Sequence, residues 1–352
     1  MRRTRLSRWL NRAAAGLTAL AGLAAAACGQ ALPNPVSSPV PSSPGSSPQP
    51  QETASPTGSG AVAPLTGLPT SAADAAKPAV ALVVAGTDPH GLTSADVVFE
   101  EITTPVRYLA VFQSRQASGV GPITGTQPAD RAALAVLHPL IGYDGATAGY
   151  FVKILDKSKK IRDEGFASHP SLYTSAAQGI TASTRKISGA ARGIPAPPPL
   201  FQYQGPGADA LAASGVFRPT AVRLSIPGSG TQEWGFSSHT DRWTLTRGGP
   251  KVAVSNLVVQ TVPYKQITVN RRTGVVVPNA QVIGTGRAEV FAGTAPGGSG
   301  GSAAIGTWSK PRSNDVTNYF GASASPIAFT PGPTWVVLAP SGTHVSTSGE
   351  QR

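Results

Sequence analysis

The sequence predicts two folded domains, an N-terminal domain of the α+β or α/β class followed by a mostly β domain. Strand-like and helix-like segments alternate between residues 64 and 193, which is typical of an α/β layer. Short β-branched segments separated by turn residues occupy 216–340. A Pro/Gly-rich stretch at 194–215 separates them and predicts a linker. With 352 residues, 40% of them hydrophobic, the chain can bury a core in each domain.

Residues 1–27 have the layout of a secretory signal. Five arginines lie within the first twelve residues, and a 15-residue apolar run follows at 13–27. This run is shorter than the roughly 20 residues that a membrane-spanning helix needs. Small residues then lead into Cys28, the only cysteine of the chain, as at the cleavage site of a bacterial lipoprotein signal. We therefore expect Cys28 to begin the mature chain and to carry fatty acids such as palmitate.

The leader leaves two alternatives open. Lipoprotein signals usually hold an aliphatic residue where this chain has Ala25, so an ordinary signal peptide cleaved beside an incidental cysteine is one alternative. Arg2 and Arg3 are compatible with twin-arginine export, and the sequence does not distinguish that route from Sec export. Two acyl chains anchor a protein stably where one does not. Lipidation of Cys28 would place the protein on the extracytoplasmic face of the bacterial cell membrane.

Polar segments flank the folded part of the chain. Residues 28–63 consist largely of Pro, Ser, Gly and Gln, so they cannot bury enough apolar surface to offset the entropy of ordering. We expect a disordered tether there and a disordered tail at 341–352. The net charge is +12, and 24 basic and 17 acidic side chains remain without the leader arginines. This mild excess suits an anionic membrane or wall polymer. The sequence contains no Lys/Arg run with interleaved aromatic residues, so we expect no nucleic-acid partner.

The first domain begins with strands. Residues 79–86 form a continuous apolar run that predicts a buried strand, and further strands are predicted at 95–102 and 106–114. A helix is expected over 128–144, because proline fits the first helical turn and the apolar residues that follow have helical spacing. A second helix is expected over 147–160.

The second domain contains eight short segments that are rich in β-branched and aromatic residues. They are AVRLSI (221–226), DRWTLTR (241–247), NLVVQTV (256–262), QITVN (266–270), GRAEVFAG (286–293), AAIGTWSK (303–310), PIAFT (326–330) and TWVVLAP (334–340). Turn residues separate them, so we expect each to be a strand.

The best candidate ligand-binding set combines charged and polar residues of the first domain: Glu100, Arg107, Asp144, His169 and Tyr173. Glu100 and Arg107 are close enough in sequence to pair across the predicted hairpin. Asp144 lies in a Gly-rich segment that leads into a predicted helix, whose free N–H groups can hold an anion. The alternative is a structural ion pair beside a tight turn. Glu100 and Glu101 should point to opposite faces of their strand, so they cannot form an acid–base pair.

Trp308 is the candidate of the second domain. If exposed near its predicted loop, it would stack on a sugar or contact a partner; the alternative is a core aromatic residue. Motifs of catalytic and phosphate-binding loops are absent, and STRK (183–186) matches Ser-x-x-Lys enzymes without their middle motif. One cysteine and five scattered histidines predict no zinc site, and we expect no cofactor.

Several short segments recur together in a recognisable order. In the first part they are PLTGLP (64–69), ADVVFEE (95–101), VRYLAVFQS (106–114), GVGPI (119–123) and SLYTS (171–175). In the second part they are NLVVQ (256–260), GTGRAEVF (284–291), GTWSK (306–310) and PGPTWVVLAP (331–340). These segments resemble the YerB family of bacterial lipoproteins, which has a two-part domain of unknown function. The resemblance covers about 64–180 and 216–340 and implies an α/β part, a β part and a membrane-anchored outer location.

The chain departs from the pattern of that family. The family typically carries arginines where this chain has Thr124 and Gln127, and a histidine where it has Pro170. An anion site built on those groups would therefore be weak or absent here.

Together these observations predict a lipid-anchored envelope protein that is not an enzyme and binds a partner protein or a wall polymer. The alternative is an enzyme or binder acting on an anionic envelope substrate such as a lipid-linked phosphate. Arg107, the Gly-rich segment and the basic excess favour that alternative. The sequence identifies neither the ligand nor the oligomeric state.

Overall fold

The structure is a computed structural model, and it describes residues 60–86, 88–145, 160–190, 192–205, 211, 218–270, 274–293 and 301–349. The chain divides into two units, Met1–Ser55 and Pro56–Arg352, and all described residues belong to the second. Cys28, the predicted leader, most of the predicted tether and nearly all of the helix expected at 147–160 lie outside the described residues. Within the described part, no helix has the length and apolar character needed to cross a membrane.

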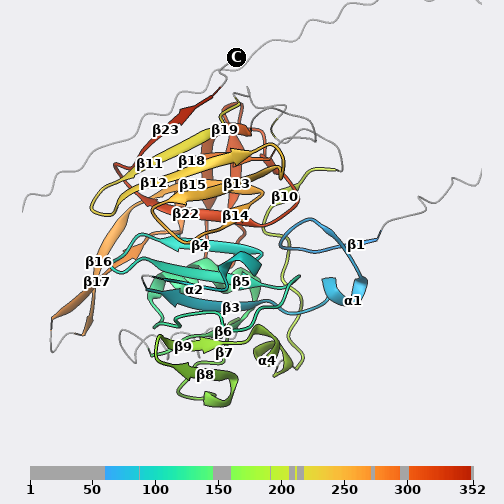
Figure 1. Ribbon diagram of the computed structural model, residues 1–352, viewed down its shortest axis with the longest axis vertical. Helices are drawn as coiled ribbons and strands as arrows, with labels where there is room; N and C mark the ends of the chain where they lie inside the picture. Colours follow the sequence, from blue (N-terminus) through green and yellow to red (C-terminus); the bar gives the residue numbers. More distant parts are fainter. Residues whose placement is uncertain are drawn as a thin grey trace, which may run out of the picture. The chain divides into compact units, whose positions relative to one another are not determined.

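A mixed ten-stranded sheet is the centre of the fold (Figure 1). Its strands are β3 (Val80–Ala85), β4 (Val97–Glu101), β5 (Arg107–Phe112), β6 (Leu140–Gly142), β7 (Arg162–Asp163), β15 (Asn256–Val262), β18 (Gly284–Ala292), β19 (Ser302–Lys310), β20 (Asn318–Gly321) and β22 (Thr334–Pro340). Their order is β20-β19-β18-β15-β22-β4-β5-β3-β6-β7. Because β22 pairs in parallel with both β15 and β4, strands from both sides of the predicted linker share one sheet.

A five-stranded antiparallel sheet packs on one face of the ten-stranded sheet. Its strands are β11 (Ala221–Ile226), β12 (Gly230–Ser237), β13 (Arg242–Arg247), β14 (Ala253–Val254) and β23 (His344–Ser348), in the order β14-β13-β12-β11-β23. The disordered tail predicted from residue 341 is corrected here, because β23 pairs with β11 over five residues. Its serines and threonines gave no apolar pattern, since it is a partly exposed edge strand.

Alternation along the strands creates two hydrophobic cores, one on each face of the ten-stranded sheet. On β4, Val97 and Phe99 face the core that contains the helix α2 (Pro128–Leu134). Val98 faces the opposite core, together with Trp335 of β22 and the inner side chains of the five-stranded sheet. Neighbouring residues of a central strand therefore contact different layers of the protein.

The α/β character expected for the N-terminal part is not confirmed, because strands dominate the described residues. The helices are short: α1 (Ala72–Ala75), α2, α4 (Thr184–Gly189) and the 3₁₀ turns η1 (Leu92–Ser94), η2 (Ala135–Leu137) and η3 (Pro170–Leu172). The helix expected over 128–144 starts as predicted but ends early. His138 adopts a left-handed conformation with φ of 50°, which a helix does not continue through, and β6 then joins the sheet.

Four two-strand sheets complete the fold. They pair β1 (Ala61–Val62) with β2 (Pro69–Thr70), β8 (Tyr173–Ala176) with β9 (Gly179–Ala182), β10 (Gln202–Tyr203) with β21 (Ala328–Phe329), and β16 (Tyr264–Asn270) with β17 (Val275–Ala280). The predicted tether therefore becomes ordered before residue 63. The predicted linker contains β10. Its residues Leu200 and Phe201 are buried, because this stretch packs against the hydrophobic core and is not a solvated connection.

Candidate functional site

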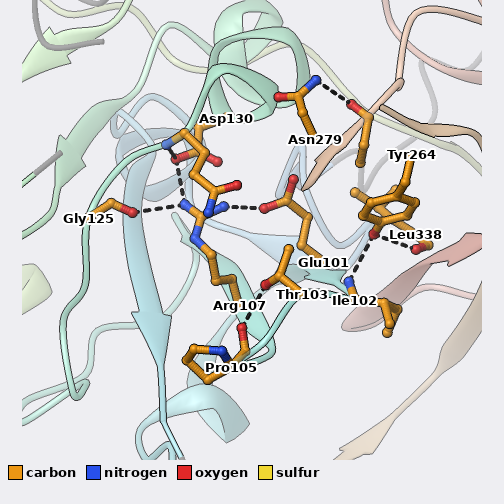
Figure 2. Close-up of polar contacts among 12 residues, drawn as sticks. Glu101, Ile102, Thr103, Pro105, Arg107, Gly125, Asp130, Tyr264, Asn279 and Leu338 are labelled. Atoms are coloured by element: carbon orange, nitrogen blue, oxygen red, sulfur yellow. Dashed lines mark hydrogen bonds and ion pairs between the residues drawn. The ribbon is translucent and has the colours of Figure 1, made fainter. Parts of the chain in front are cut away.

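Arg107 is the centre of a buried polar cluster (Figure 2). The antiparallel register of β4 and β5 places it opposite Glu101. One guanidinium nitrogen donates to the Glu101 carboxylate. A second nitrogen, Nη2, donates to Asp130 Oδ2 at 2.8 Å and to the Gly125 carbonyl oxygen at 3.0 Å. With only 4% of its surface exposed, Arg107 has no free face toward solvent.

Asp130 connects this cluster to helix α2. It is the third residue of the helix, where a negative charge interacts favourably with the free N–H groups of the first turn. Its Oδ2 also accepts a hydrogen bond of 2.8 Å from the backbone N–H of Gln127. The same carboxylate oxygen therefore caps the helix and fixes it to the sheet through Arg107.

Glu100 lies on the opposite face of β4. The register pairs it with Tyr108, not with Arg107, so the predicted Glu100–Arg107 pair is wrong. The Glu100 carboxylate instead accepts hydrogen bonds from the Trp335 indole N–H at 2.7 Å and from the Gln232 side-chain amide. These bonds link β4 to β22 within one sheet and to β12 of the other. The expected separation of Glu100 and Glu101 onto opposite faces is confirmed.

Both glutamates are fully enclosed, and burial changes their acidity. Burial raises the pKa of Glu100 to about 7, although the hydrogen bonds from Trp335 and Gln232 favour its charged form. Burial also raises the pKa of Glu101, where Arg107 favours and Asp130 opposes ionisation. One guanidinium faces two buried carboxylates in this cluster, so uptake of a proton by Glu101 removes an uncompensated negative charge.

Tyr264 attaches the base of the β16–β17 hairpin to the sheet beside this cluster (Figure 2). Its hydroxyl accepts a 2.8 Å hydrogen bond from the Ile102 backbone N–H and donates one of 2.8 Å to the Leu338 carbonyl oxygen. The hairpin itself extends away from both sheets (Figure 1). One hydroxyl thus connects the ends of β4 and β22 to the hairpin.

We expect Tyr264→Phe to lower the free energy of unfolding by about 2 kcal/mol, because a backbone donor and a backbone acceptor in a partly buried setting both lose this partner. Urea denaturation of the full chain measures this loss. Tyr319→Phe is the matched control, since it removes a single hydrogen bond of 2.7 Å to Gln260 and should cost less. An equal or larger loss for the control would contradict the bridging role of Tyr264.

His169 and Tyr173 contact Glu164, a residue that no sequence pattern pointed to. The Tyr173 hydroxyl donates to the backbone carbonyl of Glu164, and His169 Nε2 lies 3.7 Å from Glu164 Oε2. Burial raises the pKa of Tyr173, to which Asp144 adds a smaller effect. The Asp144 backbone N–H donates to the Thr124 carbonyl oxygen at 3.0 Å, next to Gly125 of the Arg107 cluster. The five predicted residues therefore do not form one site: Glu100 lies on one face of β4, Arg107 on the other, and His169 and Tyr173 beside Glu164.

Trp308 is a core residue, so the exposed contact site predicted for it is wrong and the core alternative is confirmed. Its side chain is 1% exposed, and its indole N–H donates to the Thr261 carbonyl oxygen at 2.9 Å. A Cβ atom at Gly286 would lie 2.5 Å from the indole nitrogen, so only glycine fits opposite it. In the part of the chain that the structure describes, no three His, Cys, Asp or Glu residues are placed to hold a metal ion.

Two larger cavities open on the surface of the described fold. One, of about 360 Å³, has mainly apolar walls that include Phe201, Tyr319 and Phe329. The other, of about 390 Å³, lies on the five-stranded sheet and is lined by Arg223, Glu233 and several small or hydroxylated residues.

Comparison with known protein families gives a match for both parts of the chain. Residues 65–186 match the model described as "Protein of unknown function (DUF3048) N-terminal domain", and residues 228–336 match the corresponding C-terminal domain. The chain belongs to the DUF3048 family. The crystal structure of the YerB protein from Bacillus subtilis aligns at a TM-score of 0.63 with 19% identity, over 82% of this chain and 100% of that one. This likeness establishes a shared fold, and no curated protein matches the sequence.

The two DUF3048 segments meet inside the ten-stranded sheet, where β22 of the second pairs with β4 of the first. The resemblance led us to expect arginines at Thr124, directly before Gly125, and at Gln127, two residues after it; the Gly125 carbonyl accepts a hydrogen bond from Arg107. In this DUF3048 chain, the segment beside Arg107 therefore carries no arginine at positions 124 and 127.

Proposed function

We propose that this DUF3048 protein is a lipid-anchored, non-catalytic binding protein of the bacterial cell envelope, whose ligand is a partner protein or a wall polymer. The observation that supports this is the burial of the charged groups that could otherwise have served in catalysis. Glu100, Glu101 and Asp130 are 0% exposed, and Arg107 is almost as deeply buried. A general acid or base must reach the substrate within hydrogen-bond distance. Their hydrogen bonds go to other residues of the chain, so these groups stabilise the fold. Ligand recognition would then use residues on the protein surface.

An anion-binding role centred on Arg107 has less support. Its guanidinium already has three acceptors, Glu101, Asp130 and the Gly125 carbonyl. A lipid-linked phosphate would have to displace two buried carboxylates to reach it, and the freed charges would remain in an apolar surrounding.

The anchor is supported by the sequence around Cys28. We expect Cys28→Ala to move the full chain from the membrane fraction to the soluble extracytoplasmic fraction, because no acyl chain can then be attached. Cell fractionation measures the distribution, and labelling with a fatty-acid analogue measures acylation. Ala25→Leu is the matched control, since it supplies the usual aliphatic residue and should keep both the label and the membrane location. Wild-type protein without label on Cys28 would refute the anchor.

Binding is tested separately by crosslinking in intact cells. We expect capture of the wild-type chain to enrich a discrete protein or wall fragment relative to the Cys28→Ala variant. Recovery of only abundant membrane proteins from both would contradict a binding function.

A further inference from the structure

We propose that the outer face of the five-stranded sheet binds an anionic polysaccharide, whose phosphodiester or carboxylate groups contact Arg223 and Arg247. This inference rests on the proposed function and specifies its surface and the chemistry of its ligand. It is carried by the register of the strands, the balance of charge on the outer face and the cavity beside it.

Register determines which side chains reach the outer face. On β11, Val222, Leu224 and Ile226 are buried against the ten-stranded sheet, while Arg223 is exposed between them. Arg223 pairs across the strands with Glu233 of β12, and Glu233 in turn pairs with Arg247 of β13. A row of three charged side chains therefore crosses the outer face.

This row carries more positive than negative charge. Arg223 Nη1 lies 3.4 Å and Arg247 Nη1 lies 3.7 Å from the same oxygen, Glu233 Oε1. The arginine side chains are 58% and 70% exposed. One carboxylate cannot neutralise two guanidiniums, and the exposure of both side chains leaves donors accessible to a ligand. Guanidinium groups bind phosphate and carboxylate oxygens in a planar, two-pronged geometry.

A cavity of about 390 Å³ lies beside the charged row. It arises because the neighbouring row across the strands consists of small residues, Ser348, Ala221 and Gly235. Arg223 and Glu233 form part of its wall, and hydroxyl groups form another part. The hollow thus offers a cation next to hydroxyl groups, which suits a hydrated sugar that bears an acidic substituent.

The composition of this face favours a polysaccharide over a protein. Protein interfaces usually have an apolar or aromatic centre. The large hydrophobic side chains exposed on the described residues lie elsewhere: Val62, Leu68, Val275, Val276, Ile283 and Ile305. Four neighbouring strands give the face a width of roughly 14 Å at the usual strand spacing, enough for more than one sugar unit. The overall positive charge of the chain acts in the same direction.

The proposal is tested with the full chain in non-ionic detergent and four polymers: phosphomannan, polygalacturonate, neutral dextran and poly-L-glutamate. We expect phosphomannan or polygalacturonate to bind in a salt-sensitive manner, and the preferred one shows whether phosphodiester or carboxylate is recognised. Arg223→Ala with Arg247→Ala should weaken this binding at least about tenfold. Glu233→Gln should strengthen it about threefold, because it removes the competing carboxylate.

Arg312→Ala is the matched control, because Arg312 is an exposed arginine that pairs with Asp315 outside this sheet. It should leave binding unchanged, and all variants should keep the melting temperature of the wild type. Equal binding by the double variant, or equal binding of dextran, would overturn the proposal. Preference for poly-L-glutamate would overturn it in favour of an acidic protein. Failure of every polymer to bind, with a protein captured in the cell crosslinking, would overturn this inference and leave the proposed function intact.

Discussion

Replacing Arg107 with methionine is expected to lower the free energy of unfolding by about 3–5 kcal/mol. Methionine fills much of the same volume but supplies no charge or donor. Glu101 and Asp130 would then lie buried without their cation, and the Gly125 carbonyl would lose its donor. Urea denaturation of the full chain in detergent, followed by tryptophan fluorescence, measures the loss.

Two further variants make this result interpretable. Arg312→Met removes an arginine that is 84% exposed and pairs with Asp315 at 3.3 Å, so it should cost less than about 1 kcal/mol. Adding Glu101→Gln to Arg107→Met should recover part of the loss, because it removes one unpaired buried carboxylate. If Arg107→Met costs no more than Arg312→Met, the cluster does not stabilise the fold.

Stability is expected to fall as the pH rises from about 5 to 8. Burial raises the pKa of Glu100 from 4.5 to about 7, so in this range the folded protein keeps a proton that the unfolded chain releases. Raising the pH through this window therefore favours the unfolded chain, and the contribution is lost above the folded pKa. A shift of this size corresponds to about 3 kcal/mol. The raised pKa of Glu101 acts in the same direction.

Glu100→Gln isolates the contribution of this one group. Glutamine keeps the size of the side chain and an oxygen that can accept from Trp335, but it does not titrate. The variant should therefore gain stability relative to wild type between pH 5 and pH 8, measured by denaturation at each pH. Glu233→Gln, which replaces a partly exposed glutamate of the other sheet, is measured alongside as the control variant. An equal wild-type to Glu100→Gln difference at both pH values would contradict the prediction.

The strands that could be predicted from the sequence carry an apolar pattern, which is a continuous run where both faces are buried, as in β3, and an alternation where one face is exposed, as in β11. The segments that became β3 and most of β22 are continuous apolar runs, because they lie inside the ten-stranded sheet with a core on either side. β6 has only three residues, too few to show a period, and the preceding helical pattern obscured it. β23 alternates between exposed and half-buried residues, and Val345 is its only apolar residue, so no apolar alternation marked it as a strand.

The candidate site could be predicted only in part, because its geometry depends on register and on distant partners. Alternation alone places Glu100 and Glu101 on opposite faces, and this is confirmed. A shift of one residue decides which of them meets Arg107, and no sequence pattern specifies that shift. Gln232 and Trp335 are 132 and 235 positions away from Glu100, so no local motif connects them to it. Asp130 had a usable signal, its place in the first turn of the predicted helix.

The position of β22 has a consequence for biosynthesis. Val97 of β4 pairs with Thr334 of β22, so these paired residues are translated more than two hundred codons apart. Until β22 has been translated, β4 has an open edge and the hydrophobic residues beside it have no cover. A nascent chain in this condition exposes hydrophobic surface, to which chaperones bind. The ten-stranded sheet can therefore be completed only after nearly the whole chain has been synthesised.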